Sequence, residues 1–367
     1  MKVALLGDMG FFGKYSIANN GNIFNYFKDA AVFLKGFDLV VGNLETPLCN
    51  SNTPFGYKSA YIKAEPENVE LLKYLNISIV NLANNHIFDY GVKGYKSNIE
   101  ILEKNNINYF GIEKKTLYLD CQNNKVAFSG FCCYSTNACG YYDAKTGLGV
   151  NILDAYEVEK ILLENHNKGF LNIVSIHCGQ EHIHYPNYDH IEMARKIALK
   201  VPYIFYGHHP HVIQGIEEIK DSLIAYSLGN FCFDDVYTDK SEKPLLVQTN
   251  KNKKSFILAL NIENSKLIDF DTIPIYSGDE KMIIDQNNEI RSDLDKYSRL
   301  LKIEKNIYVQ QRNEQLKAYI NSRKTLRDFK WYVKRLNLNS IMMIFNARRN
   351  LKKYKNNVKN YIKDVVK

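Results

Sequence analysis

Residues 204–215, "IFYGHHPHVIQG", place three of the nine histidines of the chain within four positions. The apolar run that precedes them, 201–206, predicts a buried strand, and a second apolar run follows in "VIQGI". His208, His209 and His211 therefore fall where the strand is expected to end. Imidazole nitrogens gathered at such a point indicate a ligand site, if other segments bring suitable groups to meet them.

Working outward from this stretch, short apolar runs alternate with longer amphipathic segments through the first two hundred residues. The apolar runs are rich in Val, Ile and Phe and nearly continuous, as in strands covered on both faces. They predict strands at 2–8, 38–43, 77–83, 125–131, 171–177 and 202–207. The segments between them predict helices at 22–35, 66–75, 92–105, 153–166 and 188–200.

After His211 the sequence becomes β-rich until about Tyr276, and from about Asn288 it becomes helical and charged. This order predicts a layered α/β body, with a mixed sheet or a sandwich of two sheets between helices. We expect two parts, a body over 1–278 and a basic helical extension over 279–367.

Polar residues follow five of the predicted strands, and in α/β folds ligand sites gather at the carboxyl ends of strands. They are Asp8; Asn43 and Glu45; Asn84, Asn85, His86 and Asp89; His177 and Glu181; and the three histidines of 208–211. Each has an ordinary explanation alone: a turn cap for Asp8, or a core position for His177. All five strand ends together favour one shared centre. Carboxylate and imidazole groups are the ligand mixture of Zn, Mn and Fe, so we expect a divalent metal site.

Five motifs then resemble one known family. "GNLETPL", "LANNHIFDYG", "HCGQE" followed by Pro186, "GHHPHVIQGIE" and "IAYSLGNF" resemble the CapA family of bacterial capsule or poly-γ-glutamate synthesis proteins, over roughly residues 2–275. That family belongs to the calcineurin-like metallophosphoesterase superfamily. The resemblance implies a four-layered α/β/β/α sandwich with two divalent metal ions, Mn, Fe or Zn, at the strand ends.

The resemblance also implies roles for single residues. Its metal ligands would be Asp8, Glu45 (with Asn43 as the alternative at the same motif), Asn85, His177, His209 and His211. His86, Asp89 and His208 would take part in catalysis, His208 beside the centre or facing the substrate. Asn43, Asn84, Glu181 and Asn230 would bind substrate. Two positions depart from the superfamily pattern: Gly10 stands where a ligand histidine is usual, and Asn43 where an aspartate is usual.

The charge of the chain is unevenly distributed. Residues 322–367 contain 14 Lys and Arg against two Asp, a balance of +12, so the net +8 of the whole chain leaves −4 for residues 1–321. Two apolar stripes run through this basic tail, at Leu326, Phe329, Val333 and Leu336, and at Leu351, Tyr354, Val358, Tyr361, Ile362 and Val365. The pattern favours helices packed on the body or on a partner such as a capsule-synthesis enzyme. The alternative is a basic amphipathic surface on anionic lipid. Nucleic acid is not expected, because the tail has no recognisable reading motif.

No apolar run reaches the roughly 20 residues that span a bilayer, and "MKVALLGDMG" does not have the pattern of a signal peptide. Seven irregularly spaced cysteines argue against a disulfide framework. We therefore expect a cytoplasmic protein, with peripheral attachment to the inner face of the membrane as an option. The predicted function is metal-dependent hydrolysis of a phosphoester or related bond of an anionic polymer. The alternative is a metal-stabilised binding or scaffold component of a capsule or polyanion synthesis machine.

Overall fold

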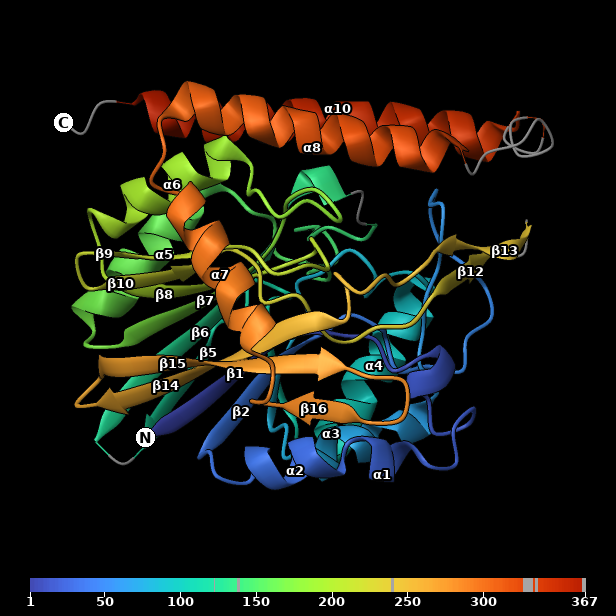
Figure 1. Cartoon of the computed structure of the whole chain (residues 1–367), viewed down its shortest axis with the longest axis horizontal. Coiled ribbons are helices and arrows are strands. Elements are labelled where there is room, and N and C mark those ends of the chain that lie inside the picture. Colours follow the sequence, from blue (N-terminus) through green and yellow to red (C-terminus); the bar gives the residue numbers. More distant parts are fainter. Residues whose placement is uncertain (122, 137–138, 239–240, 326–332, 334–335, 365–367) are drawn as a thin grey trace.

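The computed structural model describes the whole chain except residues 122, 137–138, 239–240, 326–332, 334–335 and 365–367 (Figure 1). Two large β-sheets lie face to face and helices cover their outer faces (Figure 1). All seven cysteines are free, as expected from their irregular spacing.

The first sheet has the strand order β16-β15-β14-β1-β2-β3-β4, and β11 also pairs with β1. Strands β1 to β4 are parallel, whereas β14 to β16 are antiparallel to their neighbours. Its members are β1 (Lys2–Met9), β2 (Leu39–Leu44), β3 (Ile79–Asn81), β4 (Asn108–Phe110), β11 (Asn230–Cys232), β14 (Lys254–Glu263), β15 (Lys266–Ser277) and β16 (Met282–Ile284).

The second sheet has the order β5-β6-β7-β8-β10-β9, with β6, β7, β8 and β10 parallel. Its members are β5 (Leu117–Cys121), β6 (Asn124–Cys132), β7 (Leu171–His177), β8 (Tyr203–His208), β9 (Ile216–Ile219) and β10 (Ser222–Ala225). A separate hairpin consists of β12 (Val236–Thr238) and β13 (Ser241–Leu246).

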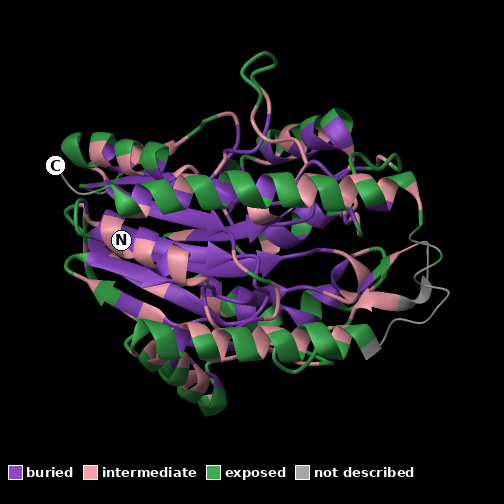
Figure 2. Cartoon of the chain, turned by 90° about the horizontal axis from the view of Figure 1, so that it is seen from above, coloured by how far each residue is buried: buried purple, intermediate pink, exposed green. Residues whose placement is uncertain are grey.

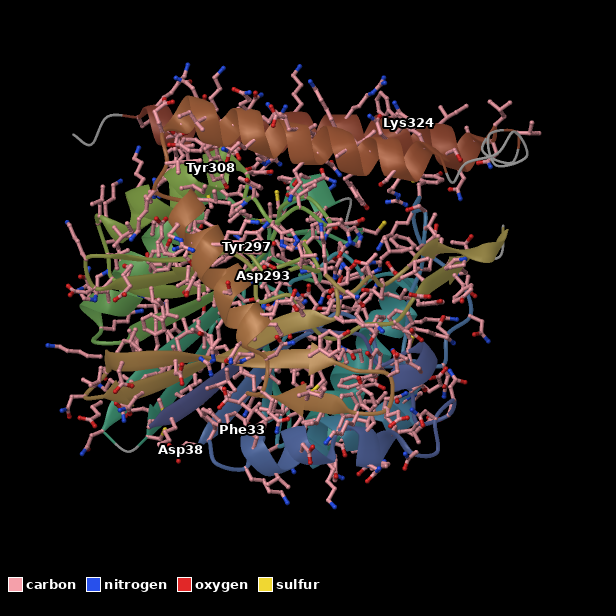
Figure 3. All side chains as sticks on the ribbon, viewed as in Figure 1. Phe33, Asp38, Asp293, Tyr297, Tyr308 and Lys324 are labelled. Carbon is pink, nitrogen blue, oxygen red and sulfur yellow. The ribbon has the colours of Figure 1, made fainter. Side chains whose placement is uncertain are left out.

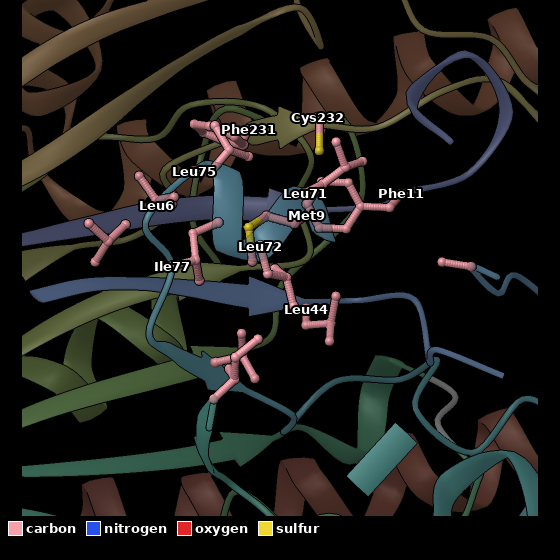
Figure 4. Close-up of a cluster of buried hydrophobic side chains, with 14 of the residues drawn as sticks. Leu6, Met9, Phe11, Leu44, Leu71, Leu72, Leu75, Ile77, Phe231 and Cys232 are labelled. Atoms are coloured by element: carbon pink, nitrogen blue, oxygen red, sulfur yellow. The ribbon is translucent and has the colours of Figure 1, made fainter. Parts of the chain in front are cut away.

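Three apolar cores separate the layers. The central core joins side chains of both sheets, such as Val41 of β2 and Ile204 of β8. A second core lies between the first sheet and α1 (Ile23–Tyr26), α2 (Lys28–Leu34), α3 (Val69–Tyr74) and α4 (Gly91–Lys104). Figure 4 shows part of it, where Leu6, Met9 and Leu44 meet Leu72. The third core joins the second sheet to α5 (Ala155–Asn167) and α6 (Tyr188–Ala198). The predicted four-layered α/β/β/α arrangement is confirmed by this order of cores.

The terminal segment forms α7 (Asn288–Leu300), α8 (Lys305–Thr325) and α10 (Leu338–Lys363). Helices α8 and α10 lie apart along one side of the body, and exposed residues line their outer faces (Figure 2). Tyr354, Val358 and Tyr361 of α10 are buried in the third core and Ile362 packs against it, so this part of the predicted stripe packs on the body. Leu351 of the same stripe is exposed, and Val365 lies outside the described residues. The other predicted stripe, 326–336, falls mostly outside the described residues.

Among the residues that the structure describes, no helix has the length and apolarity that crossing a membrane requires.

Candidate metal centre

The polar residues predicted at the strand ends meet between the two sheets. The β-ladder of the first sheet sets Asp8 of β1 opposite Asn43 of β2 and Asn230 of β11. In the second sheet, His177 of β7 is paired with His208 of β8. Parallel strands end at a common edge, so strand pairing itself gathers these side chains.

Asp8 is the residue around which the others are arranged. It is fully buried, and its Oδ1 lies 2.9 Å from His208 Nδ1 while its Oδ2 lies 3.3 Å from His211 Nδ1. The backbone N–H of His209 donates to Oδ2 at 3.1 Å, and Asn43 Nδ2 donates to Oδ1 at 2.8 Å. Burial alone would raise the pKa of Asp8, but the hydrogen bonds and charges of His208 and His211 hold it well below its usual value. Asp8 is therefore held as a carboxylate.

Glu45 lies beside Asp8 and is also fully buried. Neither of its carboxyl oxygens has a hydrogen-bond partner among the described residues. Its Oε1 is 3.7 Å from His211 Nε2 and 3.8 Å from His177 Nε2. Burial, followed by the negative charge of Asp8, raises the pKa of Glu45 well above its usual value.

This arrangement fits a divalent cation. Asp8, Glu45 and His211 each offer one ligand atom, and these atoms lie within 4.8 Å of one another. A buried carboxyl group without a donor is costly, and a cation between two carboxylates removes both the desolvation cost and their repulsion. The residues present therefore fit the group that the fold family implies.

The remaining predicted ligands surround the same point. His177 Nε2 lies 2.8 Å from Asn85 Oδ1, and the rings of His177 and His209 are 4.9 Å apart. His209 Nδ1 has no hydrogen-bond partner among the described residues. Burial lowers the pKa of His177 well below its usual value and that of His209 to about 4. Both rings are thus kept neutral, which is the form that binds metal.

The loop that carries His209 and His211 has an unusual backbone. Their φ angles are +92° and +56°, in the left-handed region that favours glycine. Non-glycine residues in this region cost free energy and persist where the surroundings hold them. Here the His209 N–H bond to Asp8 and the side-chain bond from His211 Nδ1 to Asn230 Oδ1 (2.9 Å) hold the loop.

His86 and Asp89, predicted for catalysis, form a pair at one side of the centre. His86 Nδ1 lies 2.6 Å from Asp89 Oδ2, and 13% of the His86 side chain is exposed. Burial lowers the pKa of His86. Burial would raise the pKa of Asp89, but the charges of His86 and Lys58 outweigh it and lower that pKa.

Lys58 was not among the predicted residues, yet its side chain is only 5% exposed. It forms an ion pair with Asp89, donates to the backbone oxygen of Asn85 at 2.6 Å and lies 3.1 Å from His86 Nδ1. A lysine in the polar loop "FGYKSAY" gives no sequence signal of burial. Only its three contacts with the 85–89 segment identify it.

Three residues predicted to bind substrate are buried parts of the scaffold. Asn43 accepts from Asn81 and donates to Asp8, and Asn230 orients His211. Asn84 accepts from the backbone N–H groups of residues 86 and 87, which fixes the turn. Asparagines with all these partners have little capacity left for a substrate.

Glu181, the fourth residue predicted to bind substrate, is partly exposed. Burial opposes its ionisation, but His209, His182 and His211 lower its pKa to about 2. Of the four residues, Glu181 is the one whose side chain is partly exposed and can therefore reach solvent or substrate.

His208 lies beside the centre, which is one of the two positions expected for it. It is fully buried, with Nδ1 against Asp8 and its ring edge-on to Tyr206 at 5.1 Å. At Gly10, an added Cβ would lie 2.7 Å from Phe12 and 2.9 Å from Phe233. Two aromatic rings thus fill the space beside Gly10, the position where the resemblance led us to look for a ligand histidine, and Phe233 also lies 4.6 Å from the His211 ring.

Comparison with known proteins shows the family of this chain. The model of the family described as bacterial capsule synthesis protein PGA_cap matches residues 2–235. The chain belongs to the PGA_cap family. All of the predicted site residues, Asp8 to Asn230, fall within the part that matches this family.

Two relatives in the PGA_cap family are the PGA biosynthesis protein CapA of Bacillus subtilis and the capsule biosynthesis protein CapA of Bacillus anthracis. The first is 31% identical over 240 residues, covering 63% of this chain and 62% of the relative. The second is 29% identical over 252 residues, covering 65% and 61%. The chain therefore spans about three fifths of the length of these relatives.

Solved structures similar to this chain include the calcineurin-like phosphoesterase YfkN of Bacillus subtilis, with a TM-score of 0.36 and 13% identity over 88% of this chain and 98% of that one. Another is the sulfate thiohydrolase SoxB of Thermus thermophilus, with a TM-score of 0.40 and 9% identity over 74% of this chain and 44% of that one.

Proposed function

We propose that this PGA_cap protein is a metal-dependent hydrolase that cleaves a phosphoester or related bond of an anionic envelope polymer. The observation that carries the proposal is the buried Glu45 carboxyl group beside Asp8, His177 and His211, which has no hydrogen-bond partner in the part of the chain that the structure describes. Asp8, Glu45, Asn85, His177, His209 and His211 would hold two divalent ions, Mn, Fe or Zn. Such ions polarise an ester oxygen and make a nearby water more acidic.

The chain's own residues supply the remaining functions. Asp89 fixes the His86 ring through Nδ1, which leaves Nε2 as the nitrogen that can exchange a proton with the substrate. Lys58 holds Asp89 and the backbone of Asn85 in place. Glu181 lies beside His209, where its charge disfavours a second anion and so helps to select which part of a polymer enters.

The direct test combines metal analysis with turnover. We expect purified protein to retain Mn, Fe or Zn by elemental analysis, and to hydrolyse p-nitrophenyl phosphate or bis(p-nitrophenyl) phosphate after loading with Mn. His209→Ala should lower the rate by about a hundredfold or more, since it removes a predicted ligand. His166→Ala is the matched control, because His166 is exposed on α5.

Two results would contradict the proposal. Protein that binds no metal would refute the centre. Protein that binds metal but leaves both phosphoesters and a wider panel of anionic esters intact would refute the hydrolase and favour the scaffold role.

A second role, docking on anionic lipid, is favoured by one face of α10. Ile341 and Phe345 are 63% and 60% exposed, and Arg348 and Lys352 follow on the same face at helical spacing. We name these four residues the α10 stripe. Exposed apolar side chains next to cations are typical of helices that lie in a membrane interface.

Binding to vesicles tests the α10 stripe. We expect the full chain to sediment with phosphatidylglycerol vesicles more than with phosphatidylcholine vesicles, and less so at high salt. The double variant Ile341→Asp, Phe345→Asp should bind at least about tenfold more weakly, because it removes two exposed apolar side chains that would be buried in the bilayer. Val92→Asp on α4 is the control, as Val92 is 47% exposed far along the chain. Equal loss in both variants, or no binding at all, would refute lipid docking.

A further inference from the structure

A cavity of about 340 Å³ lies where α10 meets the body. Its described lining comes from three parts of the chain: Gly56 and Tyr57; Tyr134, Cys139, Tyr141, Tyr142 and Ile152; and Asn346, Arg349, Asn350 and Lys353 of α10. The last of these lies beyond residue 235, where the match to the PGA_cap family ends. The cavity is therefore completed by the extension of this chain.

The lining combines aromatic rings, cations and amides. Four tyrosines contribute to the wall, at positions 57, 134, 141 and 142, and α10 adds Arg349, Lys353, Asn346 and Asn350. None of the residues that line it is acidic. Lys353 Nζ lies 5.2 Å from the centre of the Tyr134 ring, and the Tyr134 and Tyr141 rings are 4.8 Å apart. We refer to this cavity as the tyrosine–arginine pocket.

The two cations are available to a ligand. Neither Arg349 nor Lys353 forms an ion pair with a carboxylate of the described residues. An arginine beside a concave surface binds carboxylate or phosphate through two parallel hydrogen bonds, and a nearby lysine adds a point charge. The charge of the pocket thus selects an anion.

The aromatic part of the wall narrows the class further. The two cations would be enough to bind a flexible aliphatic anion. The tyrosine rings of the wall add flat apolar faces with polar edges. The C–H face of a pyranose ring packs on such faces, and amides such as Asn346 and Asn350 can bond to its hydroxyl groups. We propose that the tyrosine–arginine pocket binds an acidic sugar unit, a pyranose that carries a carboxylate or a phosphate.

The pocket adjoins the candidate metal centre. Lys58, the residue after Tyr57, contacts the backbone of Asn85 and pairs with Asp89. Cys139 of the pocket wall lies against Gly56, where an added Cβ would be 2.3 Å from its Sγ. If the proposed hydrolase function holds, a chain seated in the pocket would have its next unit on the His86 side of the centre. Binding in the pocket does not itself depend on that function.

The experiment is a calorimetric titration of the full chain after treatment with a chelator, so that ligand cannot bind through metal. Trigalacturonate and glucose 6-phosphate supply the carboxylate and phosphate forms of the ligand. Maltotriose is the neutral sugar, and a γ-linked glutamate trimer is the anion without a pyranose ring. We expect at least one of the two acidic sugars to bind. Maltotriose and the glutamate trimer should bind at least about tenfold more weakly, which is the usual effect of one lost charge-assisted hydrogen bond.

Variants locate the binding site. Arg349→Gln and Lys353→Gln should each weaken binding of the acidic sugar by about tenfold, because each removes one charged donor. Lys355→Gln, an exposed lysine of the same helix outside the pocket, should change it less than about twofold. Tyr142→Ala should also weaken binding, with the thermal midpoint measured to show that the variant is folded.

Each contrary result has a definite meaning. Absence of binding by both acidic sugars, or equal affinity in Arg349→Gln and Lys355→Gln, would overturn the pocket. Equal affinity for the glutamate trimer would overturn the sugar class. Binding that persists in a protein without hydrolase activity would refute the proposed reaction while it supports the pocket.

Discussion

At the scale of single residues, the sequence predicts which groups meet but not which way they point. Asp8, His177 and His211 stand at strand ends, and strand pairing alone brings such positions to one edge. The direction of each side chain depends on partners from distant segments. Asn43 and Asn230 are predicted to bind substrate, and in the structure their side chains orient Asp8 and His211. Lys58 was missed because its burial comes entirely from contacts with residues about 30 positions away.

Lys58 gives a prediction at this scale. Lys58→Met leaves the Asp89 carboxylate buried without its cation, which typically costs about 3–5 kcal/mol in the free energy of unfolding. The double variant Lys58→Met, Asp89→Asn removes both charges and should recover part of that loss. Urea unfolding of the two variants checks this. A double variant that is no more stable than the single one would contradict the assignment of the loss to the unpaired charge.

At the scale of elements, continuous apolar runs were sufficient to locate the main strands. The runs at 2–8, 171–177 and 202–207 correspond to β1, β7 and β8 within one or two residues. β4 and β5 were not predicted, since β4 has only three residues and β5 is largely exposed. The predicted helix 22–35 is divided at Phe27 into α1 and α2. Apolar continuity thus identifies buried strands, but short or edge strands leave no comparable pattern.

The contact between α7 and the body predicts a dependence of stability on pH. The His184 ring stacks on Tyr297 of α7 at 4.4 Å, and Figure 3 shows Tyr297 on this helix. Burial lowers the pKa of His184 from 6.5 to about 4. The folded state disfavours the protonated His184 ring. The contribution of the neutral ring to the free energy of unfolding is therefore complete above about pH 6.5 and is lost as the pH falls toward 4.

We expect His184→Gln to reduce the loss of unfolding free energy between pH 7 and pH 5 by about 2 kcal/mol. Urea unfolding of both proteins at the two pH values measures it. His166→Gln is the matched control. Because His166 is exposed on α5, this change should leave the pH dependence unchanged. If His184→Gln retains the full pH dependence, another group is responsible for it.

At the scale of the whole molecule, the candidate ligands come from both layers of the sandwich. Asp8 lies in β1 of the first sheet and Glu45 directly follows β2, whereas His177 ends β7 of the second sheet and His211 lies in the loop after β8. A bound ion would therefore stabilise the folded chain by mass action, since the unfolded chain has no such site. The residue pattern left a mixed sheet and a sandwich of two sheets open, and the family resemblance implied the layer order. The position of α10 could not be predicted, because an amphipathic pattern does not state which surface it will cover.

Removal of metal tests this coupling. We expect a chelator to lower the thermal midpoint of metal-loaded protein by several degrees, as ligand loss of a few kcal/mol does. Glu45→Gln should show a much smaller decrease, because it binds the ion weakly from the start. Glu67→Gln, a carboxyl group outside the centre on the segment before α3, should behave like the unaltered protein. A full chelator effect in Glu45→Gln would place the ion elsewhere.

The backbone of the His209–His211 loop limits which residues can replace these two histidines. Two left-handed backbone conformations at non-glycine residues, on either side of Pro210, disfavour β-branched replacements. Few residue types can therefore replace histidine at these two positions. A descendant that abandons metal altogether would be recognisable by glycine or asparagine at 209 and 211, with the fold around them otherwise intact.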